Sequence, residues 1–208
     1  MTSATPKPAA TRRSRAKSDR RSQLVAAAER LIAERGYLAV RLEDIGSAAG
    51  VSGPAIYRHF PNKEALLVDL LVGISTRLLD GARGVVDAGA DPESALDDLI
   101  DFHLDFALGE SDLIRIQDRD LGYLPDAAKR QVRRAQRQYV ELWVDVLCRV
   151  HERLPDGEAR LMAHAVFGLL NSTPHSVKSS APTKPAEASS RAVLRKMTVA
   201  ALASAGGN

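Results

Sequence analysis

Residues 52–63 hold side chains that could contact a nucleic acid. Tyr57, Arg58 and His59 follow one another, and Lys63 stands four residues later. Hydroxyl, imidazole and ammonium groups bond phosphate oxygens, and a guanidinium can bond either a phosphate or a guanine base. The residues before them are small and permit close approach to a groove: Ser52, Gly53, Pro54 and Ala55.

These side chains would be positioned by two short helices joined by a tight turn. The pattern predicts one helix over residues 42–49 and a second over residues 54–60, with Pro54 suited to a first helical turn. Gly50 between them can adopt the left-handed conformation that ends a helix. In a helix-turn-helix, the second helix enters the major groove of DNA and presents its N-terminal half to the bases.

The rest of the chain predicts helices and no convincing strand. From Ser18, apolar residues recur at helical spacing as far as Gly36, which is expected to end the first helix. Asn62 can cap a helix that begins at Lys63. Further amphipathic stretches follow up to residue 203, and Gly81 is among the glycines expected to loosen the chain after the fourth helix. The predicted fold class is all-α, with about nine helices.

Three regions are predicted: a basic arm at residues 1–17, a helix-turn-helix domain at 18–65 and a larger helical domain at 66–205. The net charge of +3 conceals an asymmetry, because residues 1–21 hold seven Lys or Arg and one Asp whereas residues 22–66 are neutral. The arm lacks periodicity and is expected to be disordered. It could neutralise DNA phosphates or serve only as a solubilising tail.

The residues from 44 to 64 resemble the tetracycline-repressor-type (TetR) family of regulators. The family pattern is matched by Asp44-Ile45, Gly46, Ala49-Gly50-Val51-Ser52, Tyr57-Arg58-His59-Phe60 and Lys63-Glu64. The match covers about residues 20–70, and the remainder is similar only in helix number and length. The resemblance implies a transcriptional repressor that binds a palindromic, double-stranded DNA operator as a homodimer.

The resemblance also implies roles for the matching positions. Five residues would face the major groove: Ser52, Gly53, Pro54, Ala55 and Arg58. Tyr57, His59 and Lys63 would contact phosphates. Where the family often has two threonines, this sequence has Val40, which cannot donate a hydrogen bond, and Arg41, which could replace a hydroxyl contact with a charged one.

The larger domain is expected to bind a small hydrophobic or acyl-type effector, because the resemblance implies a pocket among its middle helices. The candidate lining residues are Leu99, His103, Phe106, Ile116, Tyr123, Tyr139, Trp143 and Leu147. Each could instead be a core residue, and His103 fits a hydrogen-bonded core histidine best. The resemblance also implies that residues 158–172 and 188–203 form the dimer interface, unless they only complete the core.

Two clusters of like charge recur at helical spacing in this domain. One is basic (Lys129, Arg130, Arg133, Arg134 and Arg137) and the other is acidic (Asp97, Asp98, Asp101 and Asp105). They could be solvated faces or mutual ion pairs. Alternatively, the basic cluster would hold an anionic effector such as an acyl-CoA.

Nothing in the sequence points to an enzyme, a cofactor or a membrane protein. It has no Gly-rich phosphate loop, nucleophile elbow or His-Glu-x-x-His pair. Cys148 is the only cysteine and is expected in the core. No apolar run approaches the ~18 residues of a membrane span, so we expect a cytoplasmic protein. The alternative function is a DNA-binding regulator or architectural protein without an effector.

Overall fold

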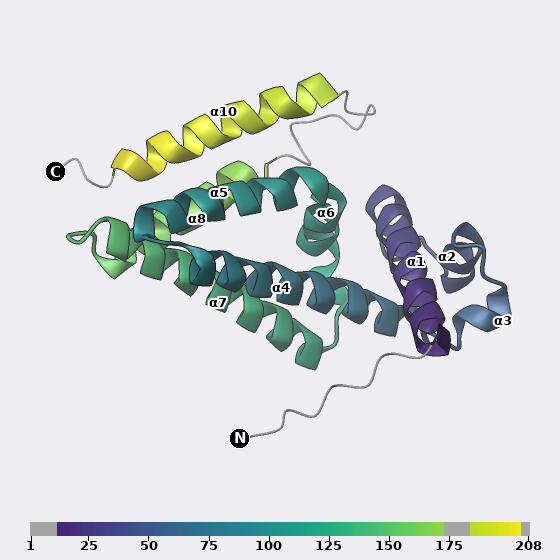
Figure 1. The fold of residues 1–208 in the computed structure, drawn as a ribbon. Coiled ribbons are helices and arrows are strands. Elements are labelled where there is room, and N and C mark those ends of the chain that lie inside the picture. The colour runs from purple at the N-terminus through teal and green to yellow at the C-terminus, as the bar shows by residue number, and fades with distance from the viewer. Residues whose placement is uncertain (1–11, 173–183, 205–208) are drawn as a thin grey trace, which may run out of the picture. The chain divides into compact units, whose positions relative to one another are not determined.

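The computed structural model describes residues 12–172 and 184–204 (Figure 1). They form nine α-helices and a 3₁₀ turn at Leu121–Tyr123, so the predicted all-α fold class is confirmed for this part of the chain. The helices are α1 (Arg12–Arg35), α2 (Leu42–Ala48), α3 (Gly53–Ile56), α4 (Lys63–Ala88), α5 (Pro92–Gly109), α6 (Ser111–Asp120), α7 (Asp126–Val150), α8 (Asp156–Leu170) and α10 (Lys184–Ala203).

The chain divides into two compact units, residues 1–67 and 68–208. The boundary that the sequence predicts between the two domains, at residues 65 and 66, lies close to this division. The functional assignment of each domain stays a prediction. None of the described helices is long and apolar enough to cross a membrane.

In the smaller unit, α1 is longer at its start than expected. It begins at Arg12, so residues 12–17 are helical and the prediction of disorder is wrong for them; residues 1–11 lie outside the described part. Residues 12–17 contain neither Gly nor Pro, and their Arg, Ala and Lys favour helix. Gly36 ends α1 as predicted, with φ +87° and its N–H donating to the carbonyl of Ile32 at 2.8 Å.

The two short helices of the helix-turn-helix are present, with Gly50 left-handed between them at φ +66°. The second helix is shorter than predicted, because only Gly53–Ile56 are helical and residues 57–59 form turns. Ile45, Ile56 and Phe60 are fully buried and hold the unit together.

Helix α4 begins with the predicted cap, in which the Asn62 side chain accepts a hydrogen bond from the N–H of Ala65 at 2.7 Å. It continues unbroken past Gly81 to Ala88, so the expected loosening is wrong at that glycine. A Cβ at Gly81 would lie 2.5 Å from the ring of Phe102. Glycine therefore permits α4 and α5 to approach closely there.

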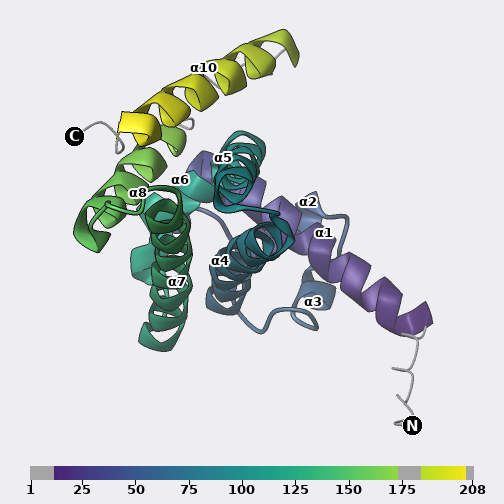
Figure 2. The same ribbon diagram turned by 60° about the vertical axis from the view of Figure 1, so that its left-hand side comes forward.

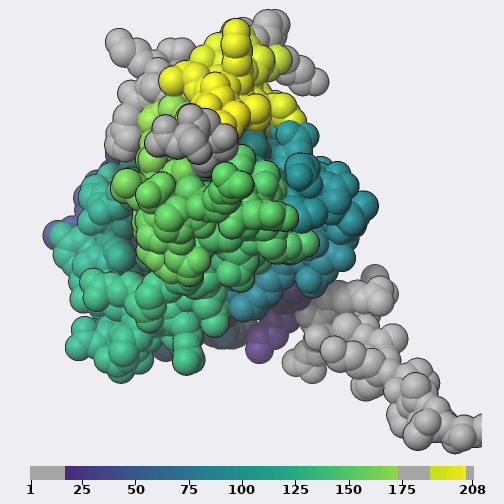
Figure 3. Space-filling model, turned by 90° about the vertical axis from the view of Figure 1, so that its left-hand side faces the viewer, coloured from purple at the N-terminus to yellow at the C-terminus, as the bar shows by residue number. Residues whose placement is uncertain are grey.

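The core of the larger unit lies where α5, α7 and α8 pack together (Figure 2). Its largest fully buried side chain is Trp143, and Leu99 and Leu147 are fully buried with it. Helix α10 packs against both α5 and α8. Figure 3 shows α8, in green, and α10, in yellow, side by side on one face of this unit.

Candidate functional site

The outer surface of the helix-turn-helix presents most of the residues predicted to face DNA. Ser52, Pro54 and Arg58 are exposed, and so is Arg41 at the start of α2. Gly53 and Ala55 are half-buried beside them. The residues of α2 and α3 that hold the unit together are buried, so the predicted contacts of this unit remain accessible to a partner.

Tyr57 is exposed, but its hydroxyl is bonded within the protein. It donates to Oε1 of Glu43 at 2.5 Å, which joins the end of α3 to α2. This hydrogen bond lowers the pKa of Glu43 and raises the pKa of Tyr57. A carboxylate therefore stands beside a predicted phosphate contact, and sequence reasoning missed it because the two residues are 14 positions apart.

Lys63 has a structural role that the sequence did not reveal. Its Nζ donates to the carbonyls of Tyr37 at 2.8 Å and Val40 at 2.9 Å, and lies 4.3 Å from the centre of the Tyr37 ring. The ammonium group thus holds the turn between α1 and α2. The Val40 side chain is fully buried, which explains why an apolar residue suits this position.

Basic residues of α1 surround His59. The Arg21 guanidinium donates to the His59 carbonyl at 2.9 Å and lies 4.2 Å from the centre of the Phe60 ring. Burial lowers the pKa of His59, and the positive charges of Lys17, Arg21 and Arg20 lower it further. Positive charge therefore reaches the end of the turn after α3 from within the folded unit, not only from the predicted arm.

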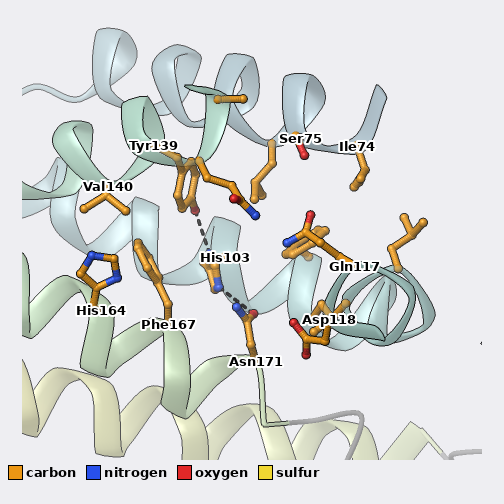
Figure 4. Close-up of a pocket in the computed structure, with 16 residues that line it drawn as sticks. Ile74, Ser75, His103, Gln117, Asp118, Tyr139, Val140, His164, Phe167 and Asn171 are labelled. Carbon is orange, nitrogen blue, oxygen red and sulfur yellow. Dashed lines mark hydrogen bonds between the residues drawn. The ribbon is translucent and has the colours of Figure 1, made fainter. Parts of the chain in front are cut away.

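The larger unit contains a cavity of about 250 Å³ (Figure 4). Three predicted residues line it: His103, Phe106 and Tyr139. Five do not: Leu99, Ile116, Trp143 and Leu147 are buried elsewhere in the core, and Tyr123 is 43% exposed. An apolar stripe on a helix marks a buried face, and it does not distinguish packed core from cavity wall.

Sequence reasoning missed the polar residues of the cavity wall. They are Ser75, Gln117, Asp118, Gln136, His164 and Asn171. Asp118 and His164 are exposed, whereas Ser75 is buried and donates its hydroxyl proton to the Leu71 carbonyl at 2.8 Å. Nothing in their spacing along the chain marks these residues, because four helices (α4, α6, α7 and α8) bring them together.

His103 lies at the buried side of the cavity and is 2% exposed. Its Nδ1 lies 2.8 Å from the Tyr139 hydroxyl, and its Nε2 lies 3.1 Å from Oδ1 of Asn171. The Phe167 ring stacks on the imidazole at 5.1 Å between centres. Burial lowers the pKa of His103 to about 4, so the imidazole is neutral near pH 7.

A second hollow, of about 400 Å³, adjoins the cavity and shares Gln136, Val140 and His164 with it. Its other lining residues are mostly charged: Arg133, Arg137, Glu141 and Arg160. Arg160 donates to both carboxylate oxygens of Glu141, at 2.5 and 2.8 Å. Arg133 and Arg137, two of the four arginines of the basic cluster, therefore line a hollow that adjoins the cavity.

Three aspartates of the acidic cluster form ion pairs with arginines of α10 and not with the basic cluster. Arg191 of α10 bonds Asp105 at 2.5 Å and Asp101 at 3.0 Å, and Arg195 bonds Asp101 at 3.2 Å and also Asp97. The expectation of ion pairs between the acidic and basic clusters is therefore wrong for these aspartates. They hold α10 against α5 instead.

Exposed apolar side chains gather on the two helices predicted to form a dimer interface. Leu161 of α8 is 71% exposed, and three large apolar residues of α10 are exposed as well: Val193, Met197 and Val199. Exposed apolar residues grouped on neighbouring helices are typical of a protein interface.

Comparison with known proteins gives matches to two family descriptions. Residues 24–70 match "Bacterial regulatory proteins, tetR family", and residues 89–193 match "Tetracyclin repressor-like, C-terminal domain". The HTH-type transcriptional repressor KstR2 of Rhodococcus jostii is 29% identical over 63% of this chain and 65% of its own length. The chain thus spans slightly less than two thirds of that relative.

Solved structures share the fold over most of the chain. The ketosteroid transcriptional regulator KstR2 of Mycobacterium tuberculosis has a TM-score of 0.75 at 23% identity, covering 89% of this chain and 94% of its own. AibR, solved in complex with isovaleryl coenzyme A and operator DNA, has a TM-score of 0.70 at 18% identity, covering 86% and 97%. These structures share the fold, and the two family matches identify the chain as a transcriptional regulator of the tetR family.

Proposed function

We propose that this protein is a ligand-responsive repressor that binds a palindromic operator as a homodimer and leaves it when a hydrophobic or acyl-type effector binds. The observation that carries the proposal is the presence, in one chain, of an exposed helix-turn-helix surface and a cavity in the other unit. A cytoplasmic location accords with this role.

DNA binding is supported by exposure and charge. The major-groove contacts are Ser52, Gly53, Pro54, Ala55 and Arg58, with Arg58 as the base-reading residue. Arg41, Tyr57, His59 and Lys63 serve the phosphate backbone, and the Tyr57 hydroxyl must exchange Glu43 for a phosphate to do so. Lys63 acts there chiefly by shaping the turn before α2.

Dimerisation through residues 158–172 and 188–203 is supported by the exposed apolar residues of α8 and α10. A two-fold dimer presents two copies of α3, and the symmetry of the protein is then mirrored in a palindromic site.

An acyl-CoA effector is supported by the pairing of the two hollows. The cavity has apolar walls that suit an acyl chain, and Arg133 and Arg137 line the adjoining hollow, where phosphates would find positive charge. The AibR structure, which shares the fold, contains an acyl-CoA together with operator DNA.

Operator binding is measured by fluorescence anisotropy, with a labelled duplex of the DNA upstream of the gene. We expect Arg58→Ala to weaken binding about 5- to 150-fold, as loss of a bidentate base contact does. Arg134→Ala removes an exposed arginine of α7 and serves as the matched control. Equal affinities of the two variants would exclude Arg58 from base recognition.

Effector release is tested by adding isovaleryl-CoA, decanoyl-CoA or the corresponding free acids to the DNA complex. We expect the CoA esters to release DNA and the double variant Arg133→Ala/Arg137→Ala to need higher concentrations. Release by the free acids alone would exclude a CoA ester. Release by no compound would favour a DNA-binding regulator or architectural protein without an effector.

A further inference from the structure

Three hydrogen-bonded side chains form the buried wall of the cavity. Their donors and acceptors determine which nitrogen of the histidine carries the proton. Figure 4 shows Tyr139, His103 and Asn171 joined by two hydrogen bonds. The amide oxygen of Asn171 can only accept, so Nε2 of His103 donates to it. The neutral imidazole then accepts the Tyr139 hydroxyl proton at Nδ1. Both ring nitrogens are satisfied, and the tautomer is set.

This arrangement leaves the amide nitrogen of Asn171 available. Asn171 lines the cavity, and its Nδ2 has no hydrogen-bond partner within residues 12–172 and 184–204. The residue is held in place because its Oδ1 is bonded to a histidine that Tyr139 orients from the other side. The cavity wall therefore carries a positioned neutral donor that nothing in the described protein uses.

The charges around the cavity determine which ligand atom such a donor can serve. None of the described residues that line the cavity is Lys or Arg. A carboxylate at this wall would be desolvated without a counter-charge, which is costly. An uncharged oxygen needs only the hydrogen bond.

We propose that the cavity binds an effector whose buried end carries an uncharged oxygen, a carbonyl or a hydroxyl, that accepts a hydrogen bond from Nδ2 of Asn171. Tyr139 and His103 act as positioning residues, and free carboxylates are rejected from this wall. The inference rests on the proposed ligand-responsive function and adds the chemistry of the end of the ligand that the cavity encloses.

The protein contains its own reporter for this binding. Trp143 is the only tryptophan, and its ring lies 5.2 Å from Phe167 and 6.1 Å from His103 between centres. Both of those residues line the cavity, so ligand entry should change tryptophan fluorescence. Three seven-carbon probes of similar size differ in their oxygen atoms. 2-Heptanone has a neutral carbonyl, heptane has no oxygen, and heptanoate has a carboxylate.

We expect 2-heptanone to bind the full chain about three- to tenfold more tightly than heptane, the advantage of one hydrogen bond. Heptanoate at pH 7.5 should bind at least tenfold more weakly than 2-heptanone. Addition of 2-heptanol distinguishes a ketone-specific wall from one that accepts any neutral oxygen. Equal affinity for 2-heptanone and heptane, tighter binding of heptanoate, or binding of none of the probes would overturn the proposal.

Variants separate the donor from the residues that position it. Asn171→Leu should abolish the preference for 2-heptanone over heptane. Tyr139→Phe should reduce that preference while leaving heptane affinity unchanged, a pattern that a merely structural role would not produce. Tyr123→Phe, at an exposed tyrosine outside the cavity wall, is the control and should match the unaltered protein. An unchanged preference in Asn171→Leu would overturn the assignment.

DNA release is measured separately on the same proteins. If acyl-CoA releases DNA but the probe preferences fail, the further inference is wrong and the proposed function stands. If the probe preferences hold but no effector releases DNA, the proposed function is wrong and the cavity chemistry stands.

Discussion

The candidate DNA-binding surface and the buried wall of the cavity hold their polar side chains in opposite environments. In the helix-turn-helix unit, Arg58, Tyr57 and Glu43 lie at the surface, where solvent and salt weaken their interactions. In the larger unit, His103 and Tyr139 are almost fully buried and bonded to each other. The first surface can respond to a charged partner at a distance, whereas the second distinguishes ligands by whether a hydrogen bond is completed.

Lys63 is the exception in the smaller unit, because its charge serves folding, and replacing it should have the largest effect. Lys63→Met leaves two carbonyls without their charged donor and should lower the free energy of unfolding by about 3–4 kcal/mol. Urea denaturation followed by circular dichroism measures this loss. Lys196→Met, at an exposed lysine of α10, should cost little; a similar small loss at Lys63 would contradict the assigned role.

Lowering the pH should decrease the free energy of unfolding of the larger unit, because His103 is buried in it. The pKa of His103 is about 4 in the folded protein, below its usual 6.5, so the unfolded chain binds a proton first as the pH falls. The stabilisation is complete above pH 6.5 and is lost between pH 6.5 and 4, by about 3 kcal/mol. His103→Gln should flatten this part of the stability profile, and His151→Gln should not. Identical slopes in all three proteins would refute the explanation.

Thr198 shows what a buried polar group does without a partner. It is fully buried in α10, and its Oγ1 has no hydrogen bond within the described residues. Thr198→Val keeps the shape and removes the unpaired hydroxyl, so the free energy of unfolding should rise by about 1 kcal/mol. Thr198→Ser keeps the hydroxyl and removes a methyl group, and it should destabilise. A destabilised valine variant would mean that the hydroxyl has a partner after all.

Glu43 should give the smallest effect, and only on DNA binding. Glu43→Gln removes a negative charge beside Tyr57 and should tighten operator binding about two- to fivefold at low salt. Glu34→Gln makes the same change at an exposed position near the end of α1. If both variants tighten binding equally, net charge alone explains the result and the contact with Tyr57 has no part in it.

The sequence predicted the smaller unit in more detail than the cavity, for a physical reason. Gly36, Gly50 and Asn62 act locally, through a left-handed backbone or a cap within three residues, so their roles are visible in the chain itself. The hydrogen bonds of Lys63 and Tyr57 span 14 residues or more and carry no local signal.

The cavity depends on such distant contacts throughout. The stripe containing Leu99, His103 and Phe106 predicted a buried face of α5 and could not show that Leu99 packs in the core while the other two line a hollow. Asn171 is paired with a residue 68 positions away. No periodicity of one helix encodes where a second helix leaves space.

The ion pairs of α10 have a further consequence for how the protein opens. Arg191 and Arg195 attach this helix to α5 through partly exposed carboxylates, whose attraction is screened by salt. Among the residues of α10 whose burial is described, Leu202 is the one buried apolar side chain. Local opening of α10 should therefore need less free energy than global unfolding. Its amide hydrogens should exchange with deuterium sooner than those of α7, and raising the ionic strength should widen that difference.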